Sequence, residues 1–232
     1  MPAKMSASQV EQKREQILDA AFAVCMRKSM HEVSMRDIIT EVGFSQGNIY
    51  RYFSNLDEIL IELMNRRRIP FDTKAAVDNA LSSGCHPEEK IGKMFKIWEK
   101  SILDNFLGIG KIYHEMRFVC ANDHERLLRI YLQNHTMIDQ EYWKEKGTDL
   151  VMQNIEKGYF KPRLPLEDIY AFLAASMDGI IRDLILTTHY NVPTSIRFEK
   201  DKLIKSLCTA FVLLLGGNEK NIYPQEEMPD DR

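Results

Sequence analysis

The sequence lacks the features of a protein built from β-sheets or inserted into a membrane. It has no sustained period-two alternation of apolar and polar residues, and no Asn-Gly turn separates two apolar runs. No apolar run approaches the roughly 20 residues that a membrane-spanning helix needs. The first residues, MPAKMSASQVEQKREQ, contain no apolar stretch typical of a signal peptide. We therefore expect a cytoplasmic protein without membrane contact.

Cysteine is scarce and scattered. The chain has four cysteines: Cys25, Cys85, Cys120 and Cys208. They form no CxxC pair, and no histidine stands near them at zinc spacing, which argues against a disulfide framework and against a metal site. Buried or incidental thiols are the main expectation, and a redox-sensing role for one of them is the alternative.

Signatures of catalysis are also missing. The sequence contains no Gly-rich phosphate loop, no GxSxG, no HExxH and no paired carboxylates at matched spacing. The six histidines show no ligand spacing. No cofactor is expected, and an enzyme remains a rival interpretation that would require perturbed ionisable groups gathered in a cleft.

The composition is that of a globular protein large enough to form its own core. The chain has 232 residues, of which 44% are hydrophobic and 28% charged. The net charge is −3, but residues 1–70 hold ten Lys or Arg and nine Asp or Glu. A slightly basic N-terminal part on an acidic body is compatible with DNA binding and does not by itself establish it.

Helical periodicity runs through nearly the whole chain and predicts an all-α protein of about nine helices. The expected helices cover about 9–28, 34–43, 45–53, 55 to an interruption at Pro70, 88–104, 109–120, 124–157, 165–188 and 197–215. The clearest loop, residues 82–87, is expected to separate a helical head from a helical body. The polar residues after 215 are expected to fray.

The most informative segment is SMRDIITEVGFSQGNIYRYFSNLDEIL, residues 34–60. Ser34 and Asp37 form a capping box, and Gly43 suits the left-handed position that ends a helix. A second short helix follows a turn of the length found in helix-turn-helix units, with Ile49 and Phe53 facing inward. Its outward positions carry amide, phenol and guanidinium groups, which are suited to base edges and phosphates.

The segment resembles the helix-turn-helix of the TetR family of bacterial regulators over about residues 10–65. The matching residues are Ser34, Ile38-Ile39, Gly43, Ser45-Gln46-Gly47, Tyr50-Arg51-Tyr52-Phe53 and Asn55-Leu56-Asp57-Glu58. The resemblance implies a DNA-binding transcriptional regulator, most simply a homodimeric repressor released from a near-palindromic operator by a small hydrophobic or aromatic effector. The rest of the chain matches this family only in its helical layout.

Residue roles follow from that resemblance. The implied DNA-binding residues are Ser34, Arg36, Ser45, Gln46, Gly47, Asn48, Tyr50, Arg51 and Tyr52. Gln46, Asn48 and Arg51 would face bases or nearby phosphates, and the others would hold phosphates or allow close approach. Two alternatives stay open: the Tyr50 ring packs in the core, and Gln46 and Arg51 are merely solvated. The family commonly has Lys where this chain has Leu56, so one phosphate contact is expected to be missing.

The expected domains are a helix-turn-helix domain at 1–54, a helical ligand-binding and dimerisation domain at 55–217, and a polar tail at 218–232. Apolar stripes on the last two long helices predict pairing of two chains in a four-helix interface. The residues assigned to it are Phe172, Met177, Ile180, Leu203, Leu207, Phe211 and Leu214. The alternative is that these stripes only cover the chain's own core.

A small-molecule cavity is expected where Met and aromatic residues concentrate. Its assigned lining is Met94, Trp98, Tyr113, His114, Arg117, Phe118 and Trp143. Such side chains at helical spacing also suit plain core, and a cationic effector held by Glu115 is a further possibility. A helix-turn-helix protein that binds DNA without a ligand is the second rival interpretation. Arg66-Arg67-Arg68 is expected to be a solvated cluster.

Overall fold

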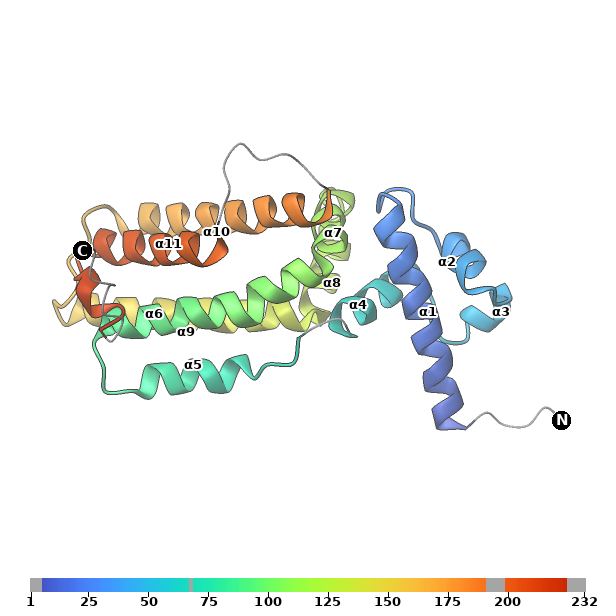
Figure 1. The fold of residues 1–232 in the computed structure, drawn as a ribbon, viewed down its shortest axis with the longest axis horizontal. Coiled ribbons are helices and arrows are strands. Elements are labelled where there is room, and N and C mark those ends of the chain that lie inside the picture. The colour runs from blue at the N-terminus through green and yellow to red at the C-terminus, as the bar shows by residue number, and fades with distance from the viewer. Residues whose placement is uncertain (1–5, 67–68, 191–198, 225–232) are drawn as a thin grey trace, which may run out of the picture. The chain divides into compact units, whose positions relative to one another are not determined.

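The computed structural model describes residues 6–66, 69–190 and 199–224, and the secondary structure within these ranges is helical. The α-helices are α1 (Ala7–Arg27), α2 (Met35–Val42), α3 (Gln46–Ile49), α4 (Leu56–Arg66), α5 (Thr73–Ser82), α6 (Pro87–Ile97), α7 (Asp104–Val119), α8 (His124–Gln133), α9 (His135–Glu156), α10 (Leu166–His189) and α11 (Lys200–Leu214) (Figure 1). The predicted all-α class, with an N-terminal helix-turn-helix and a helical C-terminal part, is confirmed.

The chain divides into two compact units, which we describe separately. The head unit comprises the described residues of Met1–Arg68 and of Gly108–His135. The body unit comprises the described residues of Ile69–Leu107 and of Thr136–Arg232. The head unit therefore includes α4, α8 and most of α7 in addition to the predicted helix-turn-helix domain, and the domain boundary at residue 54 stays a prediction.

An apolar core holds the head unit together. The apolar face of α1 is buried at Ile17, Leu18 and Val24. Ile38 of α2 and Ile49 of α3 are also inaccessible to solvent and join the same cluster. Because α3 has only four residues, its hydrogen bonds alone cannot stabilise it. Burial of Ile49 in this core is what holds α3 in place.

A buried lysine on α7 binds the end of α1. Lys111 Nζ donates hydrogen bonds to the carbonyl oxygens of Cys25 at 2.7 Å and Lys28 at 2.6 Å. Glu115, one turn further along α7, pairs with Lys111 at 3.3 Å and accepts a hydrogen bond from the Met30 amide at 2.5 Å. The last carbonyls of a helix lack partners within that helix, so this pair satisfies the C-terminal end of α1.

A second polar contact joins α8 to the start of α4. Asp57 lies in the first turn of α4, where a carboxylate is favoured by the helix dipole. Arg126 Nη2 approaches Asp57 at 2.7 Å and Arg129 Nη2 approaches it at 3.0 Å. Hydrogen bonds to Asp57 raise the pKa of Arg126. The two arginines thus attach α8 to the helix that follows the helix-turn-helix.

In the body unit, α6, α9, α10 and α11 run alongside one another, with α5 against α6 (Figure 1). The Trp143 indole N–H of α9 donates a hydrogen bond to the Met94 carbonyl of α6 at 2.6 Å. After Ile97 the helix widens into a π-helical segment, Trp98–Leu103, and then continues as α7. Inserted π turns occur often at functional sites.

Three features of the layout differ from the sequence-based predictions. Pro70 separates α4 from a further helix, α5, which the periodicity did not resolve; Asp72 caps it by accepting from the Ala75 amide at 2.9 Å. The helix expected at 124–157 is broken at Asn134 into α8 and α9. The loop at 82–87 connects two helices of the same body unit, so the expectation that it separates head from body is wrong.

The segment after α11 is packed rather than frayed along residues 215–224. Ile222 is buried, and the buried carboxylate of Glu88 accepts hydrogen bonds from Tyr159 Oη at 2.8 Å and the Asn218 amide at 3.0 Å. Gly216 has a φ of +78° and lies against the Lys161 carbonyl. The sequence underestimated this segment because its contacts come from residues distant along the chain.

The expectation of buried thiols describes three of the four cysteines. Cys25, Cys120 and Cys208 are buried and Cys85 is half-buried; none is in a disulfide. Burial raises the pKa of Cys25 to about 11 and that of Cys208 to about 12. Among the described residues there is no cluster suited to a metal ion. No helix within the described ranges combines the length and apolarity needed to cross a membrane.

Replacing Gly216 by Ala should destabilise the protein by about 1–3 kcal/mol, because the backbone is in a strained region for other residues and the added Cβ would overlap the Lys161 carbonyl. Gly84→Ala is the matched control, since its Cβ would meet no atom within 4 Å. Denaturant unfolding of both variants measures the difference. Equal stability of the two variants would contradict the close packing of this segment.

Candidate functional site

The helix-turn-helix begins with α2, whose first turn is capped as predicted. The Asp37 amide donates to Ser34 Oγ at 3.3 Å, and the Ser34 amide donates to Asp37 Oδ2 at 2.9 Å. Hydrogen bonds from Lys28 and Ser34 lower the pKa of Asp37 to about 2. Gly43 ends the helix with φ 71°, confirming its left-handed position. Helix α2 is therefore capped at both ends, and Gly43 sets the direction of the turn that leads to α3.

The second short helix of this unit, α3, is shorter than the predicted range 45–53. Its α-helical part ends at Ile49, and the chain continues as a turn in which the Tyr52 and Phe53 amides both donate to the Ile49 carbonyl. Ile49 and Phe53 are buried, as predicted. Phe44, in the preceding turn, packs against the core and lies 4.0 Å beneath the Lys13 amine.

Most residues assigned to DNA lie on the exposed face of this unit. Ser34, Arg36, Ser45, Gln46, Gly47, Tyr50 and Arg51 are exposed, and Asn48 is half-buried. Tyr50 exposes 44% of its surface, so the alternative that its ring belongs to the core is wrong. Tyr52 differs, because its half-buried ring packs against the head core and its carbonyl accepts from Arg14 at 3.0 Å.

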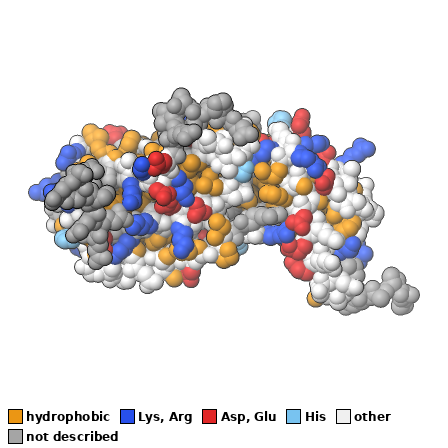
Figure 2. Space-filling view, viewed as in Figure 1, with side chains coloured by type: hydrophobic (Ala, Val, Ile, Leu, Met, Phe, Trp, Pro, Cys, Tyr) orange, Lys and Arg blue, Asp and Glu red, His pale blue; other side chains and the backbone are white. Residues whose placement is uncertain are grey.

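The cations around this face differ in their pairing. Arg27 pairs with Glu41 at 2.5 Å, and Lys28 pairs with Asp37 at the same distance. Within the described part of the chain, the side chains of Arg36 and Arg51 form neither a hydrogen bond nor an ion pair. Figure 2 shows positive and negative side chains interspersed over the face in view (Figure 2).

Leu56 has a structural role at the start of α4. It is half-buried and packs against the head core. The α4 N-terminus is capped by Asn55, which accepts from the Glu58 amide at 3.0 Å, and by Glu58, which accepts from the Ser54 amide at 2.7 Å. Leu56 thus contributes apolar contact where the resemblance implies a lysine.

The arginine run at 66–68 is only partly described. Arg66 pairs with Glu15 at 2.6 Å and Asp19 at 3.1 Å, both on α1. It therefore stabilises the head unit instead of being merely solvated, which corrects the prediction at this position. Residues 67 and 68 lie outside the described residues.

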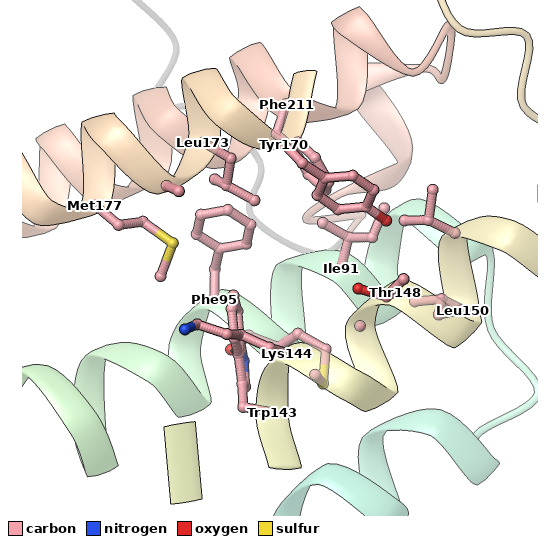
Figure 3. Close-up of a pocket in the computed structure, with 14 residues that line it drawn as sticks. Ile91, Phe95, Trp143, Lys144, Thr148, Leu150, Tyr170, Leu173, Met177 and Phe211 are labelled. Carbon is pink, nitrogen blue, oxygen red and sulfur yellow. The ribbon is translucent and has the colours of Figure 1, made fainter. Parts of the chain in front are cut away.

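The body unit contains a cavity of about 290 Å³ between α6, α9, α10 and α11 (Figure 3). It is lined by Ile91, Met94, Phe95, Trp143, Lys144, Gly147, Thr148, Leu150, Val151, Tyr170, Leu173, Ala174, Met177 and Phe211. This mostly apolar lining with a few polar groups is typical of small-molecule sites.

The predicted cavity residues are only partly brought together. Met94 and Trp143 line the cavity, whereas Trp98 is fully buried in the π-helical segment and does not. Four others, Tyr113, His114, Arg117 and Phe118, belong to the head unit and do not line this cavity. The prediction grouped these residues because aromatic residues are frequent along this part of the sequence. The boundary between the two units falls between Leu107 and Gly108, next to a kink at Ile109, so residues close in sequence belong to different units.

Glu115 is likewise no cavity residue. Its carboxylate binds Lys111 and the Met30 amide in the head unit. The suggestion that it holds a cationic effector is therefore wrong. Phe118 stacks edge-on against His114, with ring centroids 5.2 Å apart, and exposes 70% of its surface.

Sequence reasoning missed most of the lining on α9 and α10. Thr148 and Val151 on α9, and Tyr170 and Ala174 on α10, repeat at helical spacing. That spacing could have grouped the residues of each helix. It could not show that the two groups face each other, which depends on how the helices pack.

Two residues predicted to pair with a second chain instead line the cavity: Met177 and Phe211. Ile180 and Leu207 are also buried within this chain, and Leu203 is half-buried. For the four buried residues the alternative interpretation, that the stripe covers the chain's own core, describes the structure. A wide apolar face on a helix does not reveal which part of it points inward.

A separate apolar groove lies on α10 and α11. It is lined by Arg163, Leu164, Asp168, Ile169, Phe172, Ala210, Leu213 and Leu214. Phe172 exposes 46% and Leu164 50% of their surfaces. The groove thus retains Phe172 and Leu214 from the predicted pairing residues and adds neighbours that the sequence analysis did not select.

The sequence is similar to those of known bacterial transcriptional regulators. Residues 17–63 match the family described as bacterial regulatory proteins, tetR family. YfiR of Bacillus subtilis, an HTH-type transcriptional regulator, is 26% identical over 195 residues, covering 80% of this chain and 86% of YfiR. The HTH-type transcriptional repressor KstR2 of Mycobacterium tuberculosis is 24% identical over 172 residues, covering 72% of this chain and 78% of KstR2.

Solved structures share the fold. The ketosteroid transcriptional regulator KstR2 superposes with a TM-score of 0.52 at 20% identity, covering 88% of this chain and 93% of its own. A protein from Saccharomonospora viridis, solved in complex with choline, gives a TM-score of 0.54 at 18% identity, covering 88% and 96%. Residues 17–63 therefore carry the helix-turn-helix of the TetR family of bacterial regulatory proteins, and the solved structures show that the chain as a whole shares their helical fold.

Proposed function

We propose that the protein is a homodimeric, ligand-responsive repressor that leaves its operator when a small molecule fills the body cavity. The proposal that this unit binds DNA is supported above all by one observation: Tyr50 and Arg51 are exposed directly after the buried Ile49. Because Ile49 points into the core, the side chains of Tyr50 and Arg51 point away from it. The relative KstR2 is described as a repressor, which favours repression over activation.

The proposed contacts with DNA fall into two groups. Gln46, Asn48 and Arg51 read base edges or adjacent phosphates, since amide and guanidinium groups match the donor and acceptor pattern of the major groove. Ser34, Arg36, Ser45, Tyr50 and Tyr52 bind phosphates. Gly47 allows close approach, because a Cβ added there would meet no protein atom within 4 Å.

Pairing of two chains is supported by the groove on α10 and α11. Phe172 and Leu164 leave large apolar side chains exposed around it, and contiguous exposed apolar surface commonly marks an interface. A two-fold dimer would present two reading helices about 34–36 Å apart, one turn of DNA. We assign Phe172 and Leu214, with half-buried Leu203, to this interface.

The cavity supports a response to a ligand. A structural neighbour was solved in complex with choline, so this fold accommodates a small molecule. A second neighbour, KstR2, is described as a ketosteroid transcriptional regulator. The cavity helix α6 continues through the π-helical segment into α7, whose Lys111 and Glu115 bind the end of α1. A ligand that shifts α6 would thereby change the separation of the two reading helices. A regulator that binds DNA without a ligand would not need the cavity.

Selection from random-sequence DNA should enrich a near-palindromic site with half-sites one helical turn apart or a multiple of it. Each half-site would contact one copy of the reading helix. Sequencing of the selected pool, followed by footprinting, measures the spacing. Enrichment of an isolated single half-site would contradict the dimeric mode.

On the selected site, Arg51→Ala should weaken binding by about 1–3 kcal/mol if Arg51 reads a base. Gel-shift titration at fixed salt measures this change. Lys157→Ala removes an exposed cation at the end of α9 and serves as the control. Equal affinity of both variants would remove Arg51 from the interface.

Phe172→Asp should weaken dimerisation by about 2–4 kcal/mol. In the proposed dimer Phe172 would be buried between the subunits, and the substitution would place a charge there in both of them. Sedimentation velocity over a concentration series measures the dimer dissociation constant. Met152→Asp, at an exposed apolar position of α9, is the control. A Phe172→Asp protein that remains dimeric like the control would place the interface elsewhere.

A further inference from the structure

The body cavity contains one polar atom that the protein leaves unused. The Tyr170 hydroxyl is buried, and among the described residues it has no hydrogen-bond partner. Burial raises the pKa of Tyr170, and the neighbouring Thr148 side chain lowers it by a smaller amount. The phenol is therefore protonated at neutral pH and can donate a hydrogen bond. A buried donor without an acceptor is costly and uncommon in folded proteins. Such a group inside a cavity requires an explanation.

The other polar groups around the cavity differ from Tyr170. The Trp143 indole N–H is already bound to the Met94 carbonyl at 2.6 Å. Lys144 is exposed and pairs with Glu141 at 3.1 Å. Thr148 lies one helical turn after Lys144, and Figure 3 shows its hydroxyl facing that of Tyr170 (Figure 3). The donors are therefore gathered along α9 and α10.

The charge of the lining restricts the ligand. Of the residues that line the cavity, Lys144 is charged and none is Asp or Glu. A cation inside the cavity would meet no lining carboxylate, since Glu141, which pairs with Lys144, is not among the lining residues. An uncharged or anionic molecule meets no such penalty.

Aromatic walls restrict its shape. The Phe95 ring centroid lies 6.1 Å from that of Trp143 and 6.2 Å from that of Phe211. The Tyr170 ring lies 6.2 Å from Phe211 on the same wall. Rings at these separations favour contact with another ring system, and a cavity of about 290 Å³ admits a small fused-ring compound.

We propose that the effector is an apolar ring compound carrying an oxygen acceptor, a carbonyl or a carboxylate, that accepts a hydrogen bond from the Tyr170 hydroxyl. This inference deepens the proposed function and rests on it, because a cavity ligand is an effector only if its binding releases the protein from DNA. It separates this protein from the relative solved with choline, because choline is a cation and offers no carbonyl or carboxylate oxygen.

The test uses four probes on the full-length protein: 2-acetylnaphthalene, 2-naphthoate, 2-isopropylnaphthalene and choline. The first two carry the oxygen acceptor, the third has a similar shape without it, and the fourth is the cation. We expect at least one oxygen-bearing probe to bind about tenfold more tightly than 2-isopropylnaphthalene, the effect of one hydrogen bond in an apolar site. Choline should not bind measurably. Isothermal titration calorimetry gives the dissociation constants.

Tyr170→Phe should abolish the preference for the oxygen-bearing probe while leaving the affinity for 2-isopropylnaphthalene unchanged. Tyr142→Phe is the matched control, because its hydroxyl binds Asp78 at 2.7 Å and does not line the cavity. The unchanged hydrocarbon affinity also reports that Tyr170→Phe is folded. A preference that survives in Tyr170→Phe overturns the proposal, as does equal binding of the hydrocarbon, tighter binding of choline, or no binding of any probe.

Lys144→Met distinguishes the two oxygen sources. A preference for 2-naphthoate that falls in Lys144→Met supports a carboxylate, and a preference for 2-acetylnaphthalene that does not change supports a carbonyl. DNA release by the bound probe is measured separately on the selected site. Binding with the expected preference but without release would contradict the ligand-responsive function and leave the assignment of the cavity chemistry intact.

Discussion

Burial of Ile49 and Phe53 in the head core is the constraint on which the DNA-reading surface depends. A helix of four residues has too few internal hydrogen bonds to persist alone. Its geometry is imposed by apolar contact with α1 and α2, and that contact determines which neighbouring side chains face outward. Tyr50 and Arg51 are exposed, whereas Ile49 before them and Phe53 two residues after Arg51 are buried. The orientation of the surface that we propose to read DNA thus follows from the way the core is packed.

Polar contacts secure this core from outside the helix-turn-helix. Lys111 binds the carbonyls that α1 leaves unsatisfied, and Glu115 holds both that lysine and the Met30 amide. Asp57 receives Arg126 and Arg129 at the start of α4. Each contact joins a helix end to α7 or α8. Since such contacts are directional, they fix α7 and α8 against α1 and α4 within the head unit.

In the body, the same side chains serve as core and as cavity wall. Phe95, Trp143 and Phe211 are almost fully buried, yet they border an opening of about 290 Å³. Cavities in well-packed proteins forfeit contact energy, and this opening is the place where we propose that a ligand binds. The π-helical segment that follows α6 lies along the chain between this opening and α7.

The sequence by itself determined the all-α class, the capping box at Ser34, the left-handed turn at Gly43 and the inward face of the head helices, because these depend on neighbours within a few residues. It predicted Met94 and Trp143 at the cavity but could not separate them from Tyr113 and His114. Only the tertiary structure decided that Tyr170 and Met177 face α6 and α9, and that Glu115 binds the end of α1. Helical periodicity shows which residues share a face, whereas the partner of that face is set by long-range packing among helices far apart in the chain.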